Sequence, residues 1–490
     1  MSNSHSNSSS PAKMLGFILG PLLFILLIFF AEPANSDIWR VLALALWMIC
    51  WWVSEAVPIP VTALLPLVLL PYLGVFTLAE STAPYANPII FLFMGGFMIA
   101  LGLEKHNLHQ RIALNMIRVT GTSANGIILG FMLATALLSM WISNTATTVM
   151  MLPIATSVIS TLLPGDIGNS SQRCPAAEKK FALGLMLSIA YAANIGGSMT
   201  LIGTPPNVVM VGYLKELINF EMAFSQWLSI GIPAGAAMLT ITYLLITRLL
   251  FASDIKDIEG SDALIDEKLT ALGSFSKAET LVTIIFALTV CCWIFKPQLN
   301  ELIGWPLLSD VTTAMVGGIL MFITPLDFKK GQFLMQWEDA SRLPWGVLIL
   351  FGGGMCLASS MEKSGIIQAV GSFVAQYHEL GLLSMIVIVT TLVLFMTELM
   401  SNVALVSIFI PVIIGISSGL DINPLYLVIP ATIASSCAFM MPIATPPNAI
   451  VFASGHIRIK EMMRAGVLLN MVCIVILTVI GFVLVPKIFY

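Results

Sequence analysis

Long apolar runs constrain this chain more than any other feature of its sequence. A helix that crosses a bilayer needs about 20 apolar residues, and residues 14–31 and 467–486 are runs of this kind. Charged residues make up only 10% of the 490 residues. Soluble domains carry roughly 25%, so this chain lacks the charged faces that a soluble surface needs. The sequence therefore predicts an all-α polytopic membrane protein.

Two apolar segments do not fit as single crossings. Residues 123–161 and 381–417 are each too long for one span and carry Ser-Asn near the middle with little charge. Two full spans would need a hydrophilic turn of water-exposed backbone between them. We therefore predict two re-entrant hairpins, each made of two half-length helices that meet at a buried tip. Apolar length predicts about 11 full crossings, at 14–32, 37–53, 58–75, 87–103, 181–214, 226–250, 279–295, 305–323, 344–361, 424–455 and 463–487.

An ordered series of matching residues indicates an internal duplication. Ser143-Asn144 recurs as Ser401-Asn402, at an offset of 401 − 143 = 258. The same offset relates Phe93 to Phe351, Glu104 to Glu362, Lys105 to Lys363 and Pro153 to Pro411. Paired halves with interrupted apolar segments at equivalent places point to the binding site of a transporter.

A second motif belongs to the same duplication. Thr-Pro-Pro-Asn at 204–207 recurs at 445–448, where 445 − 204 = 241. A polar insertion at 164–180, present only in the first half, accounts for the shorter offset. If each repeat holds an odd number of crossings plus a hairpin, the two repeats are inverted in the membrane.

Charged residues predict the orientation of the loops. We expect the basic loops of the first half to lie in the cytoplasm; they carry Lys105, Arg111, Arg118, Arg173, Lys179 and Lys180. The acidic stretch 253–278 is expected to be a flexible connector between the repeats. The Ser/Asn-rich residues 1–13 predict a disordered tail, and the apolar run that follows favours a retained first helix over a cleaved signal peptide.

The Thr-Pro-Pro-Asn motifs predict broken helices. Proline has no N–H to donate and clashes with the preceding turn, so a helix must end before it. Threonine is a good N-cap and proline is favoured at the first helical position. A new half-helix should therefore begin after Thr204 and again after Thr445.

These helix starts predict the class of ligand. Few Lys or Arg residues lie inside the apolar runs, so an anion would lack a side-chain counter-charge. Helix N-termini can supply roughly half a positive charge each, with free N–H donors. The hydroxyls of Ser139, Ser143 and Thr397, together with unwound carbonyls, suit a hard cation such as sodium. Anion and cation sites side by side are typical of a symporter.

The motifs closely resemble those of the divalent anion–sodium symporter family. The resemblance rests on Ser143-Asn144-Thr145, Ser401-Asn402-Val403 and the stretch 442–455, and it extends over the whole chain. It implies a homodimer of eleven-helix protomers in a bacterial inner (plasma) membrane. Each protomer would have a scaffold (14–122 and 279–380) and a mobile transport domain (123–252 and 381–490) that moves as an elevator. The implied substrate is a C4 dicarboxylate or citrate, taken up with Na+.

The resemblance also implies the ligands of each site. For sodium it implies Ser139, Ser143, Asn144 and the backbone of Gly197 at one site, and Thr397, Asn402 and the backbone around Ala444 at the other. For the substrate it implies Asn144, Thr145, Ser198, Asn402, Thr445 and Pro446. Val403 stands where the first motif has Thr145, so a hydroxyl is missing from the second copy.

Several alternatives stay open from the sequence. The chain could be a carboxylate exchanger without sodium coupling, or a sodium/sulfate symporter. Glu398, beside the second motif, could bind a proton or cation, or pair with hairpin backbone. An enzyme would need a spaced nucleophile, base or metal set in the spans, a channel would need a continuous polar stripe, and nucleic-acid binding would need a basic cluster. None of these patterns occurs in the sequence.

The seven cysteines predict core thiols. They show no C-x-x-C spacing, so neither disulfides nor a metal site are expected from the sequence.

Overall fold

The computed structural model describes residues 11–29, 36–162, 176–253, 255, 258, 260–304, 307–374 and 381–489. Most of the predicted tail and most of the polar insertion at 164–180 lie outside these residues. The first helix begins at Pro11, inside the predicted tail. The predicted connector contains a helix, Ser261–Ala271, over part of its length.

The described part of the first half consists of helices joined by short loops. Its elements are α1 (Pro11–Phe29), α2 (Ser36–Ser54), α3 (Ile59–Thr62), α4 (Leu65–Tyr72), α5 (Leu78–Thr82), η2 (Ala83–Ala86), α6 (Pro88–Lys105), α7 (Leu108–Thr120), α8 (Ala124–Ser139), α9 (Asn144–Leu162), α10 (Ala176–Ser198), α11 (Pro205–Ile218), α12 (Phe224–Leu244), the π-helix η3 (Leu245–Leu250) and α13 (Ser261–Ala271).

The second half adds one small hairpin to a second series of helices. Its elements are α14 (Lys277–Ile294), α15 (Lys296–Ile303), α16 (Asp310–Ile323), β1 (Pro325–Asp327), η4 (Phe328–Lys330), β2 (Gln332–Phe333), η5 (Trp337–Arg342), α17 (Trp345–Lys363), α18 (Ile366–Val374), α19 (Leu382–Met396), α20 (Asn402–Gly419), α21 (Leu425–Ser435), α22 (Pro446–Ala453), α23 (Ile459–Val479), the π-helix η7 (Ile480–Leu484) and α24 (Val485–Phe489). β1 and β2 pair antiparallel.

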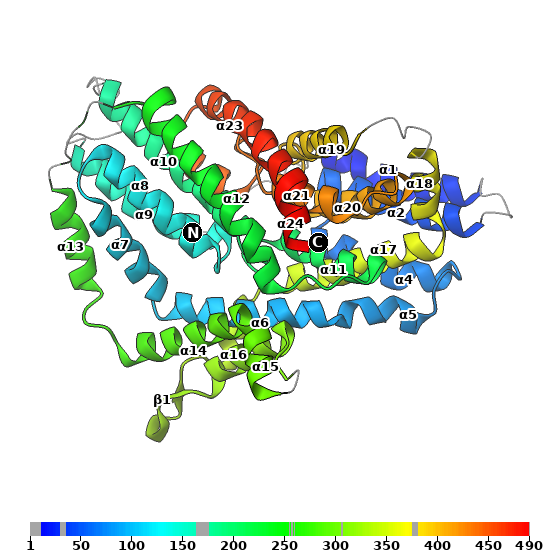
Figure 1. Cartoon of the computed structure of the whole chain (residues 1–490), viewed down its shortest axis with the longest axis horizontal. Coiled ribbons are helices and arrows are strands. Elements are labelled where there is room, and N and C mark those ends of the chain that lie inside the picture. Colours follow the sequence, from blue (N-terminus) through cyan, green and yellow to red (C-terminus); the bar gives the residue numbers. More distant parts are fainter. Residues whose placement is uncertain are drawn as a thin grey trace.

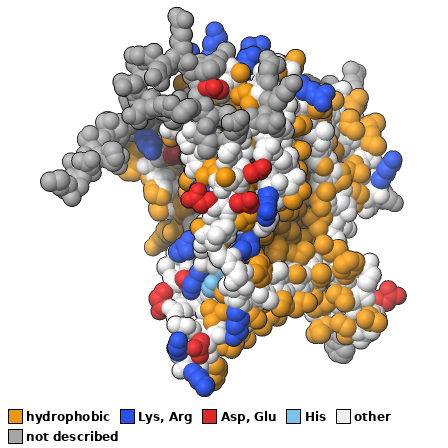
Figure 2. Space-filling model, turned by 90° about the vertical axis from the view of Figure 1, so that its left-hand side faces the viewer, with side chains coloured by type: hydrophobic (Ala, Val, Ile, Leu, Met, Phe, Trp, Pro, Cys, Tyr) orange, Lys and Arg blue, Asp and Glu red, His pale blue; other side chains and the backbone are white. Residues whose placement is uncertain are grey.

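The apolar helices make this a multi-pass integral membrane protein. Within the described ranges, 8 helices are long and apolar enough to cross a bilayer, and further apolar helices are shorter. The apolar window of α10 is 100% buried, whereas that of α14 is 28% buried. α10 is therefore a central helix, and α14 presents an apolar surface that suits lipid contact. Figure 2 shows broad hydrophobic areas on one face, with the charged side chains gathered into patches.

Prolines divide several of the predicted crossings. The segment predicted as one span at 58–75 forms two short helices, α3 and α4, and proline stands in the first turn of each. The predicted spans 181–214 and 424–455 are interrupted before Pro205 and Pro446, as the Thr-Pro-Pro-Asn motifs predict. The arms of the two predicted hairpins have 16 and 19 residues (α8, α9) and 15 and 18 residues (α19, α20), longer than half-length.

The duplication extends to irregular backbone. α12 and α23 begin at Phe224 and Ile459, an offset of 459 − 224 = 235. Each continues directly into a π-helical turn, at Leu245 and Ile480, again 480 − 245 = 235 apart. π-helical turns are rare and often lie near functional sites, so a matched pair strengthens the case for an ancestral repeat.

Helices of the first half lie on both sides of the molecule, and on one side they join helices of the second half (Figure 1). In Figure 1, α8, α9, α10 and α12 lie on the left, while α17, α18 and α20 lie on the right with α1 and α2. α10 contacts both α9 and α22, and α11 contacts both α17 and α20. The interrupted helices therefore connect the two sides at the centre of the fold.

Candidate functional site

The turn between α8 and α9 gathers an oxygen cluster. The Ser139 hydroxyl lies 2.7 Å from the Oδ1 atom of Asn144 and 2.7 Å from the carbonyl oxygen of Ala193 on α10. Ser139 is fully buried. A hydroxyl carries one hydrogen, so it can satisfy only one of these two acceptors. The cluster therefore holds more oxygen lone pairs than donors, which is the environment a hard cation needs.

The turn between α19 and α20 repeats this cluster. The Thr397 hydroxyl lies 2.7 Å from Oδ1 of Asn402 and 2.5 Å from the carbonyl oxygen of Ser435 on α21. Thr397 is also fully buried, and its single hydrogen again serves two acceptors. The duplication has thus preserved an excess of acceptors at both turns.

Backbone carbonyls complete the first cluster around a glycine. A Cβ atom added at Gly203 would meet the carbonyl oxygen of Gly197 at well under 3.0 Å, and those of Ser139 and Met140 at 3.0 Å. A Cβ atom added at Gly197 would in turn collide with Oδ1 of Asn144. The backbone thus converges three carbonyls on a point that only glycine leaves open. The predicted donors Ser139, Asn144 and Gly197 lie together beside this glycine, and their oxygen atoms are the type of ligand that a hard cation such as sodium prefers.

Two other predicted sodium ligands have different surroundings. Ser143 is exposed, and its hydroxyl accepts the N–H of Ala146 at 3.2 Å, which caps the start of α9. Ala444 is buried, and its N–H donates to the carbonyl of Met441 at 3.2 Å. Its own carbonyl would be the atom available to a cation.

The asparagine that ends each Thr-Pro-Pro-Asn motif holds the unwound segment before it. The Nδ2 atom of Asn207 donates to the carbonyls of Ser198 (3.3 Å) and Thr200 (2.7 Å). That of Asn448 donates to the carbonyls of Ala438 (2.9 Å) and Met441 (3.0 Å). Backbone freed by a helix break inside the membrane must find partners, and these amides supply them. The motif is visible in the sequence, but which carbonyls its asparagine binds depends on the path of the unwound segment.

Asn194 ties the two interrupted helices together. It lies on α10, is fully buried, and its Nδ2 atom contacts three acceptors of the second half. These are the Ala438 carbonyl (3.3 Å), the Thr445 hydroxyl (3.1 Å) and Oδ1 of Asn448 (3.5 Å). Sequence reasoning missed this residue, because its partners are about 250 positions away, as 445 − 194 = 251 shows.

Glu398 pairs with backbone. Its carboxylate accepts the N–H groups of Phe439 (2.8 Å), Met440 (3.0 Å) and Met441 (3.1 Å), and the side-chain amide of Asn470 (3.0 Å). Of the two roles left open by the sequence, this geometry matches pairing with backbone. The carboxylate thus accepts from four donors, three of which are backbone N–H groups of the unwound segment after α21.

The predicted substrate residues form an open group and a closed group. Thr145 and Pro446 are exposed, and Asn144, Asn402 and Val403 are half-buried. The starts of α9, α20 and α22 thus border accessible space, where the first helical N–H groups lack intrahelical partners.

Ser198 and Thr445 belong to the closed group. Both are buried; the Ser198 hydroxyl donates to the Ile195 carbonyl at 2.7 Å, and the Thr445 hydroxyl accepts from Asn194. To contact a substrate, either hydroxyl would need to exchange these partners.

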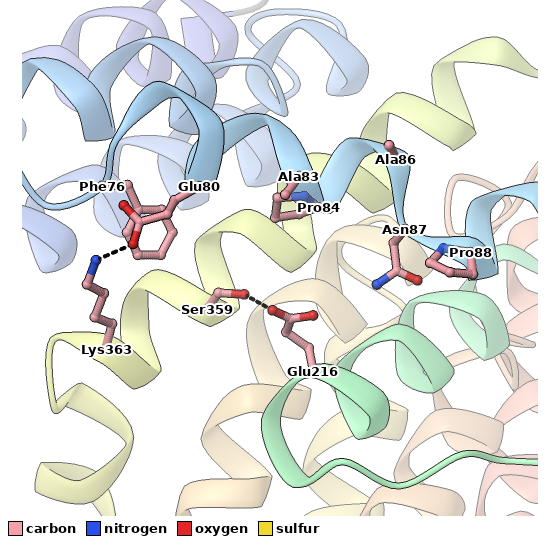
Figure 3. A pocket seen from close by; sticks show the side chains of 10 residues that line it. All are labelled: Phe76, Glu80, Ala83, Pro84, Ala86, Asn87, Pro88, Glu216, Ser359 and Lys363. Carbon is pink, nitrogen blue, oxygen red and sulfur yellow. Dashed lines mark hydrogen bonds and ion pairs between the residues drawn. The ribbon is translucent and has the colours of Figure 1, made fainter.

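A separate cavity of about 480 Å³ lies where α11 faces α17 and the start of α6. Figure 3 shows the Ser359 hydroxyl of α17 pointing at the Glu216 carboxylate of α11, to which it donates a hydrogen bond of 2.7 Å. Beside it, Lys363 forms an ion pair of 2.8 Å with Glu80. This cavity is distinct from the Ser-Asn turns.

Comparison with known proteins gives close relatives over nearly the whole chain. A transporter of Staphylococcus saprophyticus named sodium-dependent dicarboxylate transporter SdcS is 40% identical over 494 residues, which covers 99% of this chain and 94% of the relative. Its Staphylococcus aureus namesake (strain USA300) is 39% identical over 484 residues, 97% of this chain and 92% of the relative.

Solved structures support the fold. Neisseria gonorrhoeae MtrF aligns with a TM-score of 0.55 at 11% identity, covering 97% of this chain and 96% of that one. The Alcanivorax borkumensis YdaH transporter aligns with a TM-score of 0.56 at 14% identity, covering 97% and 98%. At such low identity the likeness concerns the fold alone.

The family match settles the classification. Residues 13–488 match the family described as the sodium:sulfate symporter transmembrane region. This match and the identity to the staphylococcal transporters confirm the resemblance seen in the motifs. The chain therefore belongs to the sodium:sulfate symporter family, the divalent anion–sodium symporters.

Proposed function

We propose that this protein is a secondary transporter that takes up a di- or tricarboxylate together with sodium across a bacterial plasma membrane. The observation that carries the proposal is the duplicated oxygen cluster, in which the single hydrogen of Ser139 or Thr397 serves two acceptors. Relatives about 40% identical are named sodium-dependent dicarboxylate transporters. Oxygen clusters suited to a cation, placed beside helix N-termini suited to an anion, agree with that name.

Sodium and substrate would use adjacent parts of the two turns. Ser139, Asn144 and the Gly197 carbonyl would hold one cation, and Thr397, Asn402 and the Ala444 carbonyl the other. A bound cation adds positive charge beside the carboxylate and links its movement to the sodium gradient. Residues proposed to contact the substrate are Asn144, Thr145, Ser198, Asn402, Thr445 and Pro446.

The starts of α9 and α20 give the substrate its positive field. Each helix N-terminus offers unpaired N–H groups and a partial positive charge, and the exposed positions of Thr145 and Pro446 leave room for a ligand. A dicarboxylate with one carboxylate at each helix start would use both copies of the motif. Val403 offers no hydroxyl, so the second carboxylate would depend more on backbone N–H groups.

We further propose that transport proceeds by an elevator motion in a homodimer. In this arrangement about 11 spans and two re-entrant hairpins form two inverted repeats. The scaffold would comprise 14–122 and 279–380, and the moving domain 123–252 and 381–490. The cavity beside α11 and α17 lies at the boundary of this division, and the Glu216–Ser359 hydrogen bond links the two parts across it.

Uptake of labelled succinate into proteoliposomes tests the proposal. We expect uptake to rise steeply with an inward sodium gradient and to fall to background when choline replaces sodium. Uptake unchanged in choline would refute symport and favour exchange. Competition by malate, fumarate, citrate and sulfate then separates carboxylate from sulfate transport: strong competition by sulfate alone would favour the sodium/sulfate alternative.

A further inference from the structure

Three sulfur atoms meet in the core next to the second unwound segment. The Cys437 thiol lies 3.8 Å from the thioether sulfur of Met238, and the Cys473 thiol lies 3.5 Å from the same atom. All three side chains are 1% exposed.

The three sulfurs come from separate elements. Met238 lies on α12, Cys473 lies on α23, and Cys437 follows the end of α21. α23 packs against both α12 and α21, and Figure 1 shows the three helices together. Because the cysteines are 473 − 437 = 36 positions apart, they have no C-x-x-C spacing from which the cluster could be predicted.

We propose that Met238, Cys437 and Cys473 form a binding site for a soft monovalent metal ion, with Cu(I) as its preferred occupant. Thiolate and thioether ligands select soft metals such as Cu(I). With metal–sulfur bonds of roughly 2.3 Å, the sulfurs of a trigonal site lie about 4 Å apart. The two separations to the Met238 sulfur, 3.8 and 3.5 Å, are slightly shorter, so small outward adjustments admit the ion.

The charge balance suits an apolar core. Binding forms three Cu–S bonds and releases one thiol proton to water, while the second cysteine stays protonated. The Cu(I) charge and the one thiolate then cancel, and no electron is transferred. A neutral complex avoids the large cost of a buried net charge.

A metal in this site would act on transport. Cys437 stands one residue before Ala438, whose carbonyl accepts from Asn448 and Asn194. Three metal–sulfur bonds would join α12, α23 and the segment after α21 into one rigid unit. The segment after α21 also carries Ala444, a proposed cation ligand, so we expect Cu(I) to restrain the second cation site and slow sodium-dependent uptake. This consequence rests on the proposed function, whereas the binding itself does not.

Cu(I) binding to the purified, reduced full-length protein tests the site. All variants are made in a background protein that carries Cys291→Ser and Cys292→Ser, because these substitutions remove an adjacent pair of thiols outside the cluster. Competition with the chelator bathocuproine disulfonate, carried out under anaerobic conditions, measures the affinity for Cu(I). We expect Cys437→Ser and Cys473→Ser each to weaken binding by more than the roughly 10–100-fold that loss of an outer-shell partner costs. Met238→Leu should weaken it by about 10-fold or more.

Cys356→Ser removes a buried thiol on α17 and is the matched control; we expect it to leave the affinity unchanged. Equal Cu(I) affinity in the background and in the Cys437→Ser/Cys473→Ser variant would overturn the proposal and leave the cluster as sulfur packing only. X-ray absorption on the background protein, which needs no core substitution, should show three sulfurs at about 2.3 Å. Two sulfurs, or nitrogen and oxygen neighbours, would refute the three-sulfur site.

Discussion

Gly203→Ala tests the proposed carbonyl cage most directly. Gly203 does not have a positive φ, so alanine suits its backbone and the added methyl acts by crowding alone. That methyl would meet the carbonyls of Gly197, Ser139 and Met140 at 3.0 Å or less. All three belong to backbone, which cannot swing aside as a flexible side chain can. The carbonyls must therefore move apart.

We expect the crowding by the added methyl group to weaken the affinity for sodium. Overpacking a well-packed site costs typically 1–3 kcal/mol, and about 1.4 kcal/mol corresponds to a tenfold change in affinity. If this strain appears mainly at the first cation site, the sodium concentration for half-maximal uptake should rise by roughly 5- to 150-fold. Maximal uptake at saturating sodium should fall much less, because the substrate contacts lie at the helix starts.

Succinate uptake in proteoliposomes, measured against sodium concentration, checks this shift. Gly96→Ala is the matched control: its added methyl would meet only the Ile202 side chain, at 3.4 Å or more, so its sodium curve should match the wild type. Size-exclusion profiles of both variants verify folding. A folded Gly203→Ala protein with wild-type sodium dependence would refute the assignment of these carbonyls to a cation.

Three other perturbations separate the proposed roles. Asn144→Ala and Asn402→Ala should each abolish sodium-dependent uptake with folding intact; normal transport in both would reject the site assignment. Glu398→Gln places an amide NH2 group among backbone donors, and an unsatisfied buried donor costs about 1–3 kcal/mol, so the thermal midpoint should fall; an unchanged midpoint would show that the carboxylate does not hold the unwound segment. In a Glu216→Cys/Ser359→Cys variant, a short bifunctional reagent that joins the two thiols through disulfide bonds should block uptake, and a reductant should restore it. Full uptake after verified cross-linking would argue against movement of α11 along α17.

The local breaks in this fold could be predicted because proline acts on its own neighbourhood. A proline prevents the preceding turn from continuing, so Pro205 and Pro446 located two helix starts without any tertiary information. The same rule applies to Pro66, whereas the apolar length of 58–75 alone predicts one span. The structure shows that the proline decided the outcome.

Contacts between distant segments could not be predicted in this way. The role of Asn194 depends on acceptors in the second half, and the sulfur cluster depends on Met238 reaching two cysteines on other elements. No spacing rule connects such residues, because their proximity is set by helix packing. The Ser-Asn motifs mark the turns that carry Ser139 and Thr397, while helix packing brings the carbonyls of Ala193 and Ser435 to these hydroxyls.

The differences between the two repeats are as informative as their similarity. Met140 and Glu398 are equivalent, since 398 − 140 = 258, and both accept hydrogen bonds from the adjacent unwound segment, but one does so through its backbone and the other through its side chain. In the first repeat the Met140 carbonyl accepts the Thr200 hydroxyl; in the second the Glu398 carboxylate accepts three backbone N–H groups. A carboxylate next to Thr397 makes the second cation cluster the more negative environment. The second turn also lacks the hydroxyl of Thr145, because Val403 stands there. The duplication thus gives the two turns the same framework, and the departures from it place a carboxylate beside Thr397 in one turn and the Thr145 hydroxyl at the start of α9 in the other.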